Sequence, residues 1–215
     1  MQQDLSDYRK SYNKSELMED SIKENPMEQF QNWFYEVEAT DGVEEANAMT
    51  ISTIGLDGFP KSRVVLMKKY TFEGFIFYTN YNSEKGKAIA KNPEVCLSFF
   101  WPNLERQVII KGRAERIADN LSDGYFESRP VGSQLGAIVS PQSDVIDSRE
   151  ILESKLAQLE SQYEGKEIER PAYWGGYLVR PISLEFWQGR PNRLHDRIRY
   201  TLQSDYDWKI ERLAP

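Results

Sequence analysis

The stretch WQGRPNRLHDRIRY, residues 187–200, concentrates groups that could perform chemistry. It holds His195, the only histidine of the chain, between Arg193 and Arg197 and close to the indole of Trp187. The whole chain has a formal net charge of -7, so this local group of cations opposes the overall balance. A solvated loop is one explanation. The other is an anion-binding site with an imidazole beside it, because guanidinium groups pair well with oxyanions.

Further basic and hydroxyl residues lie at the ends of expected strands. Arg63 opens a β-rich run and Lys68 lies near its end, and their odd spacing would place them on opposite faces of an unbroken strand. Tyr78 and Thr79 precede a short expected helix that Ser83 can cap and whose first turn holds Lys85. Free N–H groups at a helix start, hydroxyls and a lysine suit a phosphate. A capped surface helix with a lysine on it would look the same.

A third group of polar residues lies in YFESRPVGSQLGAIVSPQS, which carries Tyr125, Arg129, Ser133, Gln142 and Ser143. Arg129 precedes a proline, which tends to end a helix there and leaves the guanidinium free to bind an oxyanion. Gln107 lies in a β-type run, where its amide could hydrogen-bond the edge of a heterocycle. The alternatives are that Arg129 pairs with a carboxylate such as Glu127 and that Gln107 faces solvent.

Several classes of site are excluded by composition and motif. A single histidine cannot build a multi-histidine metal centre, and no HExxH or EF-hand spacing occurs, so we expect no metal. Dinucleotide and P-loop glycine motifs are missing, and Cys96 is the only cysteine, which excludes an internal disulfide. A Ser-His-Asp triad would have to use His195, whose neighbouring cations disfavour the imidazolium form.

Charge and hydropathy exclude two kinds of partner. Asp and Glu number 34 against 27 for Lys and Arg, which argues against general binding of nucleic acid. No apolar run is long enough to cross a bilayer, so we expect no membrane partner. Residues 1–20 contain no apolar signal core, and we therefore expect a cytoplasmic protein.

The elements that position these residues are mostly strands. Residues 1–25 are polar and are expected to form a mobile arm or lid, whereas residues 26–215 are expected to form a single domain. Asn25-Pro26 marks the start of an amphipathic helix, and alternation typical of strands begins at Ala48. Residues 119–163 have a helical pattern, with Asp119 as the expected cap and one apolar stripe over 151–163, after which β-type residues return. Many short strands without regular βαβ alternation favour a mainly β fold, an antiparallel barrel with flanking helices outside it.

Six motifs, taken in order, resemble the pyridoxine 5′-phosphate oxidase family: RVVLMK (63–68), FYTNYNSEKGKAI (77–89), LERQVIIKGRAER (104–116), YFESRPVGSQLGAIVSPQS (125–143), FWQGRPNRLHDR (186–197) and WKIERLAP (208–215). The resemblance implies an FMN-binding split barrel that works as a homodimer with two sites at the subunit interface. It also implies oxidation of pyridoxine 5′-phosphate or pyridoxamine 5′-phosphate to pyridoxal 5′-phosphate. Hydride would leave substrate C4′ for flavin N5, dioxygen would reoxidise the flavin to give hydrogen peroxide, and the amine substrate would also release ammonia.

The resemblance also implies roles for individual residues. The implied FMN contacts are Arg63, Val64, Val65, Leu66, Met67, Lys68, Tyr78, Thr79, Lys85, Gln107, Gln142, Ser143, Trp187 and Arg197. The implied substrate contacts are a phosphate clamp of Lys68, Tyr125, Arg129 and Ser133, a ring-binding group of Arg193, Leu194 and His195, and a lid of Arg9, Lys10, Ser11 and Tyr12. Arg193 and His195 are the implied catalytic residues. Arg193 would favour the ionised pyridinol, and His195 would hydrogen-bond the ligand, since adjacent cations keep it neutral.

One departure and two alternatives belong with this hypothesis. The family usually shows Arg-Lys where this chain has Glu84-Lys85, so we expect weaker FMN binding unless Glu84 points away. Another split-barrel FMN oxidoreductase would share the first motifs but would not need Tyr125, Arg129 and Ser133 together. A carrier of pyridoxal 5′-phosphate or FMN without turnover would have the same sequence features.

Overall fold

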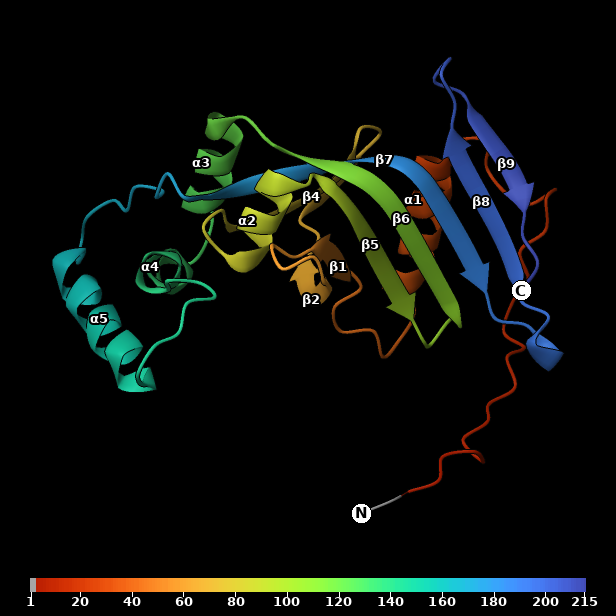
Figure 1. Cartoon of the computed structure of the whole chain (residues 1–215), viewed down its shortest axis with the longest axis horizontal. Coiled ribbons are helices and arrows are strands. Elements are labelled where there is room, and N and C mark those ends of the chain that lie inside the picture. The colour runs from red at the N-terminus through yellow and green to blue at the C-terminus, as the bar shows by residue number, and fades with distance from the viewer. Residues whose placement is uncertain (1–2) are drawn as a thin grey trace. The chain divides into compact units, whose positions relative to one another are not determined.

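The computed structural model describes residues 3–215, so the first two residues of the expected arm lie outside the described residues (Figure 1). The helices are α1 (Pro26–Glu38), α2 (Glu84–Lys91), α3 (Asp119–Glu127), α4 (Val131–Val139), α5 (Arg149–Gln162) and the short 3-10 helix η1 (Pro191–Arg193). The strands are β1 (Ala48–Ile54), β2 (Pro60–Leu66), β3 (Lys69–Thr71), β4 (Gly74–Asn80), β5 (Glu94–Trp101), β6 (Arg106–Arg116), β7 (Trp174–Gln188), β8 (Asp196–Leu202) and β9 (Trp208–Arg212).

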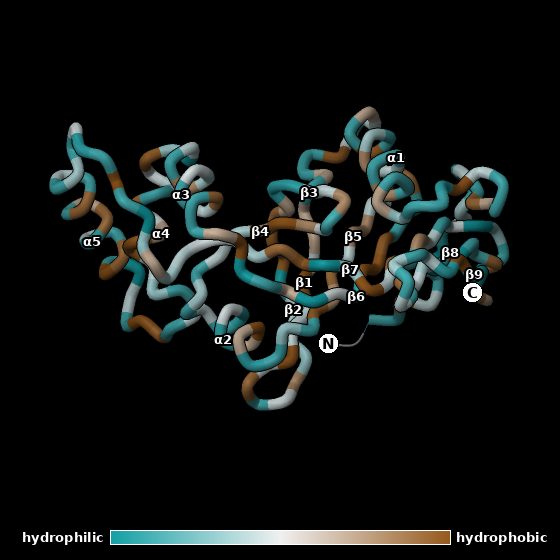
Figure 2. The backbone as a smooth tube through the Cα atoms, turned by 90° about the horizontal axis from the view of Figure 1, so that it is seen from above, coloured by the Kyte–Doolittle hydropathy of each residue, from teal (hydrophilic) through white to brown (hydrophobic). Residues whose placement is uncertain are grey.

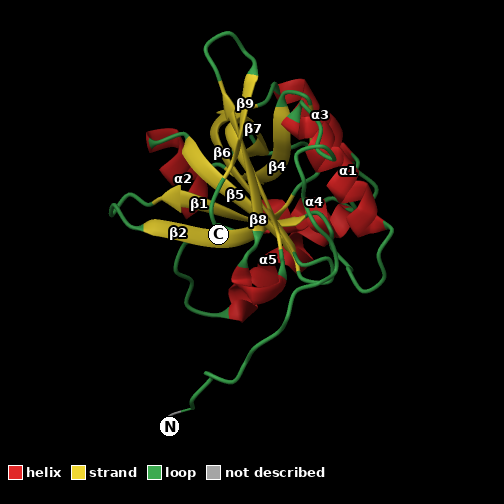
Figure 3. Ribbon diagram, turned by 90° about the vertical axis from the view of Figure 1, so that its right-hand side faces the viewer, coloured by secondary structure: helices red, strands yellow, loops and turns green. Residues whose placement is uncertain are grey.

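The strands pair in the order β2-β1-β5-β6-β7-β4-β3, and β8 pairs with both β7 and β9. Figure 3 shows the strands in yellow and the helices in red. The register places Tyr78 opposite Gly176 where β4 pairs with β7, and Trp187 opposite Arg197 where β7 pairs with β8. Both of these pairings are antiparallel. The chain is thus mainly β with flanking helices, which confirms the expected fold class.

Contacts along the chain divide it into two compact units. The terminal unit comprises residues 3–50, Leu97–Lys111 and Pro181–Pro215, and the central unit comprises Ile51–Cys96 and Gly112–Arg180. A single domain over 26–215 stays a prediction.

The core of the central unit has two parts. Along β4, Phe75 and Phe77 are fully buried, and Figure 2 shows this strand as a hydrophobic segment. Phe126, Leu135 and Trp174 belong to a second cluster, against which residues of α5 pack. The apolar stripe expected on α5 therefore contacts the core of this unit through its partly buried side chains.

Two local expectations in the central unit are wrong. The run from Arg63 to Lys68 is not one strand, because β2 ends at Leu66 and the Lys68 N–H bonds to the carbonyl of Ile76 instead. The alternation argument for opposite faces therefore does not apply to this pair. Asp119 is not the cap of α3 but its first helical residue, and its carboxylate lies 3.1 Å from the guanidinium of Arg170.

The first turn of α2 is built as the sequence predicts. The Ser83 hydroxyl accepts a hydrogen bond from the N–H of Gly86 at 3.2 Å. A Cβ at Gly86 would lie 2.2 Å from the carbonyl oxygen of Tyr81, which is closer than any real contact. Glycine is therefore required for the helix to start directly on the backbone of the preceding loop.

In the terminal unit, the Asn25 side chain accepts a hydrogen bond from the N–H of Met27, so α1 begins as expected. Its Phe30 and Trp33 are buried, and the Phe30 ring lies 5.2 Å from that of Phe99. The turn between β8 and β9 protrudes in Figures 1 and 3. No helix in residues 3–215 has the length and apolar character needed to cross a membrane.

Candidate functional site

A cavity of about 460 Å³ lies in the central unit; we call it the central cavity. It brings together many of the expected contacts, which come from β2, β4, α2, α3, α4 and the segments next to them: Val64, Val65, Leu66, Lys68, Tyr78, Thr79, Lys85, Tyr125, Arg129, Ser133 and Gln142. Asn80, Pro130 and Trp174 complete the lining. Residues between Val64 and Trp174 that are far apart in the sequence thus line the same central cavity.

Lys85 supplies a buried cation on one side of the central cavity. Lys85 is 8% exposed, and its Nζ lies 3.3 Å from the hydroxyl oxygen of Thr79. The Thr79 hydroxyl in turn donates a hydrogen bond to the side-chain oxygen of Gln142 at 3.2 Å. Burial lowers the pKa of Lys85, and the nearby charge of Arg63 lowers it further. Among the described residues no carboxylate forms an ion pair with this lysine. A buried cation without a carboxylate favours binding of an anion.

Arg129 is a second cation of the central cavity. Its guanidinium carbon lies 4.6 Å from the ring centre of Trp174, and burial lowers its pKa. Its Nη1 is buried without a hydrogen-bond partner within residues 3–215. The alternative pairing with Glu127 is not observed in that part of the chain. An orphaned buried donor is costly, so this nitrogen is suited to an incoming acceptor.

Aromatic rings form one wall of the same cavity. The Tyr78 and Tyr125 rings stack with centres 3.9 Å apart, and Trp174 stacks on Tyr78 at 5.6 Å. Burial raises the pKa of Tyr78, and the neighbouring Tyr125 adds to that shift. The Tyr78 hydroxyl therefore keeps its proton near pH 7 and can act as a hydrogen-bond donor.

A second cavity of about 700 Å³ lies in the terminal unit; we call it the terminal cavity. Its lining joins the arm to the loop after β7: Tyr8, Arg9, Lys10, Ser11, Tyr12, Trp187, Arg190, Asn192, Arg193 and His195. The expected lid residues and the expected ring-binding residues are thus brought together within one unit. No acidic side chain is among these lining residues, so the terminal cavity is cationic and aromatic.

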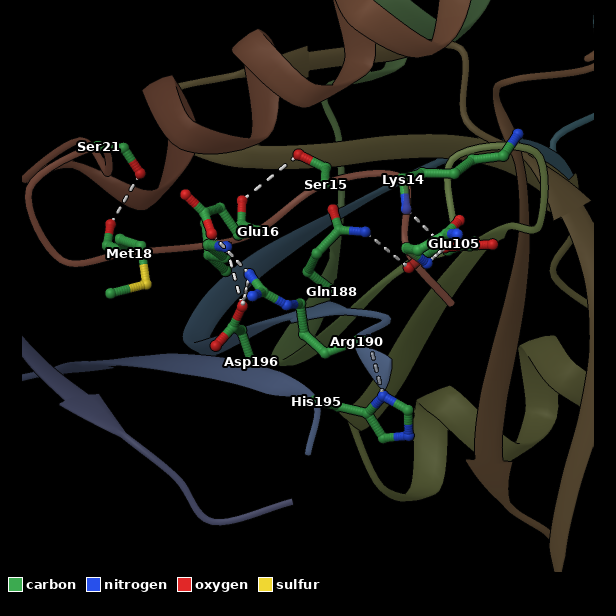
Figure 4. A network of polar contacts seen from close by, with 12 residues as sticks. Lys14, Ser15, Glu16, Met18, Ser21, Glu105, Gln188, Arg190, His195 and Asp196 are labelled. Atoms are coloured by element: carbon green, nitrogen blue, oxygen red, sulfur yellow. Dashed lines mark hydrogen bonds and ion pairs between the residues drawn. The ribbon is translucent and has the colours of Figure 1, made fainter. Parts of the chain in front are cut away.

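The environment of His195 fixes its tautomer. The backbone N–H of Arg190 donates to His195 Nδ1 at 3.0 Å (Figure 4). Since Nδ1 accepts, the neutral ring carries its proton on Nε2. Burial lowers the pKa of His195, and the charge of Arg193 is the second cause. The direction agrees with the expectation from the sequence, but burial and not the neighbouring cation is the larger cause. The Trp187 ring lies 4.7 Å from the imidazole.

Some expected contacts line neither cavity. Leu194 is 68% exposed and Met67 is buried. The Arg197 guanidinium bonds to Glu185 at 2.8 Å and to the carbonyl oxygen of Ala214. The remaining residues of this kind are Arg63, whose Nη1 donates to the Thr53 hydroxyl at 2.7 Å, the half-buried Gln107, and the exposed Ser143. Their proposed roles stay predictions.

The structure also adds residues that the motifs did not single out. Trp174 lies in the ring stack, and Arg190 holds His195 through its backbone, for which a sequence carries no signal. Asn192 and Arg193 both have positive φ, at 58° and 61°. Asn after Pro is a recognisable turn signal, but the strained arginine after it is not. These two residues form the turn at which Arg193 lines the terminal cavity.

Glu84 points away from the expected phosphate site. Its carboxylate pairs with Nζ of Lys61, and Glu84 is not part of the central cavity lining. Its charge nevertheless acts on Lys85, whose pKa it raises in opposition to burial. Lys61 therefore partly offsets the negative charge of Glu84 near the expected phosphate site but does not remove it.

Comparison with known proteins shows the family. Residues 36–163 match the model of pyridoxamine 5′-phosphate oxidase, and residues 174–215 match the pyridoxine 5′-phosphate oxidase C-terminal dimerisation region. The chain is 70% identical over 212 residues to the pyridoxine/pyridoxamine 5′-phosphate oxidase of Flavobacterium psychrophilum, covering 99% of both chains. It is 54% identical to that of Christiangramia forsetii, covering 100% of both.

Solved structures agree in fold. A crystal structure of PhzG from Burkholderia lata 383, in complex with tetrahydrophenazine-1-carboxylic acid, has a TM-score of 0.86 and 28% identity, covering 93% of this chain and 98% of that one. A pyridoxamine 5′-phosphate oxidase-related, FMN-binding protein from Nostoc punctiforme has a TM-score of 0.70 at 15% identity, covering 90% and 100%, and shows the fold alone. The chain belongs to the pyridoxine/pyridoxamine 5′-phosphate oxidase family of FMN-dependent oxidoreductases.

Proposed function

We propose that this protein oxidises pyridoxine 5′-phosphate or pyridoxamine 5′-phosphate to pyridoxal 5′-phosphate with FMN as its cofactor. One observation carries the proposal. The central cavity contains the buried cation Lys85 and the partly buried cation Arg129, whose Nη1 is itself buried, and neither forms an ion pair among the described residues. Two phosphorylated molecules, one of them the cofactor and the other the substrate, account for both.

The residues around Lys85 fit the phosphate of FMN. The Lys85 ammonium and the Thr79 hydroxyl lie together at the start of α2, where helix N–H groups favour an anion. Arg63 adds positive charge nearby, as its effect on the pKa of Lys85 shows. Gln107, Gln142, Ser143, Trp187 and Arg197 are the further proposed FMN contacts, together with Val64, Val65, Leu66, Met67, Lys68 and Tyr78.

The residues around Arg129 fit the phosphate of the substrate. The guanidinium has an unused buried nitrogen, and Lys68, Tyr125 and Ser133 line the same cavity with one ammonium and two hydroxyls. A planar guanidinium can donate two parallel hydrogen bonds to a phosphate, which fixes the direction of the ligand as well as its charge. This clamp would orient the ring of the vitamin.

Arg193 and His195 are the proposed groups at the reacting end. The Arg193 guanidinium would stabilise the ionised pyridinol oxygen, and this added electron density favours departure of hydride from C4′. His195 Nε2–H would donate a hydrogen bond to the ligand, because Nδ1 is already an acceptor for Arg190. Bound FMN supplies the hydride acceptor, and dioxygen supplies the oxidant that regenerates it with formation of hydrogen peroxide.

Assembly and location complete the proposal. We infer a homodimer because residues 174–215 match a dimerisation region, and we place the two sites at its interface. The arm residues Arg9, Lys10, Ser11 and Tyr12 would cover the occupied site. A single cysteine leaves no internal disulfide, which fits a reducing compartment such as the cytoplasm.

The test is the visible spectrum of the purified protein loaded with FMN. Anaerobic addition of pyridoxine 5′-phosphate should bleach the flavin band, and admission of air should restore it with release of peroxide and pyridoxal 5′-phosphate. Pyridoxine without its phosphate is the matched control and should bleach the band far more slowly. A bound flavin that no B6 phosphate reduces would favour the carrier, and reduction by a nicotinamide alone would favour a different split-barrel oxidoreductase.

A further inference from the structure

A buried carboxylate lies in the tight turn between β5 and β6, outside the site residues named so far. Glu105 is 1% exposed, and its φ of 56° is unusual for a residue other than glycine. Burying a carboxylate is unfavourable unless donors satisfy it. A side chain buried at a strained position calls for a structural explanation.

The donors that satisfy Glu105 all come from the N-terminal arm. Its Oε2 accepts from the N–H groups of Asn13 at 2.9 Å and Lys14 at 3.2 Å, and its Oε1 lies 3.3 Å from Nζ of Lys10. Figure 4 shows Lys14 beside Glu105. These three contacts bracket Tyr12 on both sides. The carboxylate therefore fixes the backbone that carries the Tyr12 ring.

Gly189 forms the surface on which Tyr12 rests. A Cβ at Gly189 would lie 2.8 Å from both Cβ and Cγ of Tyr12 and 3.1 Å from Cβ of Glu105. The N–H of Gly189 also donates to the carbonyl oxygen of Glu105 at 2.8 Å. The arm thus packs directly against backbone, and a larger residue at this position would displace the tyrosine.

Tyr12 in turn touches the aromatic groups of the terminal cavity. Its ring centre lies 5.8 Å from that of Trp187 and 5.7 Å from that of His195, in edge-on arrangements. Edge-to-face contacts at these distances are favourable and have a defined direction. The position of one side of the cavity therefore depends on Glu105 through the arm.

The turn that carries Glu105 is held independently of the arm. The amide nitrogen of Gln188 donates to the carbonyl oxygens of Leu104 at 3.1 Å and Glu105 at 3.3 Å. The amide oxygen of Gln188 accepts from Nε of Arg106 at 2.9 Å. These bonds hold the turn in place without any contribution from the arm, so the position of the Glu105 backbone does not depend on the arm.

We propose that Glu105 is a positioning residue for the oxidation: it clasps residues 10–14 so that Tyr12 closes the terminal cavity beside His195. The effect of Glu105 on the oxidation rests on the proposed function. The contact between Glu105 and residues 10–14 does not depend on that function. The carboxylate of Glu105 would thus determine where the lid residues of the arm lie.

The experiment uses the full-length protein loaded with FMN and three variants. Glu105→Gly removes the carboxylate and tolerates the positive φ, so the turn is retained. Glu105→Gln keeps the size and one acceptor oxygen but loses the charge that attracts Lys10. Glu94→Gln is the matched control, because Glu94 is an exposed acid on β5 whose partner Arg113 is also exposed.

Limited trypsin digestion reads the clasp directly, since the arm contains cleavage sites after Lys10 and Lys14. Cleavage by the protease follows the population of the open arm, and Glu105→Gly should speed cutting after Lys14 by about tenfold or more. Loss of binding contacts without loss of chemistry raises KM, so KM for pyridoxine 5′-phosphate should rise about tenfold while kcat changes by less than about twofold. Glu105→Gln should lie between the wild type and Glu105→Gly in both measurements.

The outcomes separate the claims. Equal cutting of wild type and Glu105→Gly would overturn the clasp, and so would equal cutting of wild type and Glu105→Gln should the glycine variant not fold. Faster cutting with unchanged KM would overturn the positioning of Tyr12. A wild type that oxidises neither B6 phosphate contradicts the proposed function, while the digestion still decides whether Glu105 holds the arm.

Discussion

The backbone of Arg190 and the imidazole of His195 are joined by one hydrogen bond, in which the main-chain N–H donates to Nδ1 over 3.0 Å. A main-chain donor cannot lose its proton near neutral pH, so this bond always favours the unprotonated Nδ1. The ring is thereby poised as a hydrogen-bond donor through Nε2 and not as a general base.

We expect His195 to titrate below its ordinary pKa of 6.5, because burial and the Arg193 charge both disfavour the imidazolium. As pH falls from neutrality, the ring should stay neutral past the point where a free histidine is half charged. The chain has one histidine, so the single Hε1 resonance of its imidazole in the NMR spectrum reports the titration without residue assignment. Arg193→Leu should raise the value. A wild-type midpoint above 6.5 would contradict the geometry.

Replacing Arg193 with Leu should reduce turnover much more than cofactor retention. Removing one donor that stabilises developing negative charge lowers kcat by about a hundredfold in comparable sites. FMN binding should be preserved, because the proposed phosphate contacts of FMN lie in the central cavity. Equilibrium dialysis of FMN and steady-state kinetics measure the two effects, with the exposed Arg149→Leu as control. Equal losses of both would show that Arg193 serves FMN as well.

Lys85→Met should weaken FMN binding by about ten- to a hundredfold, the value of one charge-assisted hydrogen bond. Lys91→Met, at the other end of the same helix and exposed, is the matched control. Fluorescence quenching of free FMN gives both dissociation constants. The same affinity in both variants would mean that the buried ammonium does not contact the phosphate.

The pH dependence of FMN binding should follow the lowered pKa of Lys85. Below that pKa the free protein holds a charged ammonium and binds fully. As pH rises through it, the free protein loses the proton that the phosphate complex retains, so affinity falls. The fall should begin below the ordinary pKa of 10.5 and vanish in Lys85→Met. An identical profile in the variant would assign the titration to another group.

Arg129→Lys should raise KM for the B6 phosphates by about tenfold, because lysine loses both the fork to the phosphate and the stacking on Trp174. FMN affinity should not change. Arg113→Lys is a control with the same substitution on an exposed strand position. Unchanged KM would show that the orphaned guanidinium nitrogen faces something other than substrate phosphate.

Glu84→Arg should tighten FMN binding by about two- to fivefold, in line with a single charge near the end of a helix. The gain should shrink in high salt, because the group is partly exposed. Glu153→Arg, on the exposed side of α5, changes the same charge far from the helix start. No tightening would make Glu84 a bystander whose charge Lys61 already neutralises.

Local signals in the sequence predicted most of the elements. Asn25-Pro26 and Ser83 mark helix starts through side chains that bond the next turn, and these bonds are present. The break after Leu66 is not apparent in the sequence, because β-type residues such as Val65 and Tyr70 lie on both sides of it. After the break, the N–H of Lys68 bonds to the carbonyl of Ile76, which belongs to a later strand. Hydrogen bonding between strands that are distant in the sequence cannot be predicted from a local sequence pattern.

Side-chain types in the sequence predicted the candidate site residues. Features of the site that do not depend on side-chain type could not be predicted in this way. Arg129 and Lys85 were recognised as cations ahead of the structure, whereas their lack of carboxylate partners depends on the fold. Arg190 acts through its main chain, which every residue possesses, so no residue type reveals it. Glu105 looked like an ordinary acid in a turn. Only its burial and the three arm contacts distinguish it.

The contact between Gly86 and the carbonyl of Tyr81 has a thermodynamic consequence for ligand affinity. Because α2 begins in van der Waals contact with the preceding loop, the N–H groups and the Lys85 side chain have little freedom left once the chain has folded. The entropy of arranging them is lost during folding and not when the proposed FMN phosphate binds. Gly86→Ala would therefore weaken the proposed binding of FMN by disturbing the start of α2, although it removes none of the proposed FMN contacts.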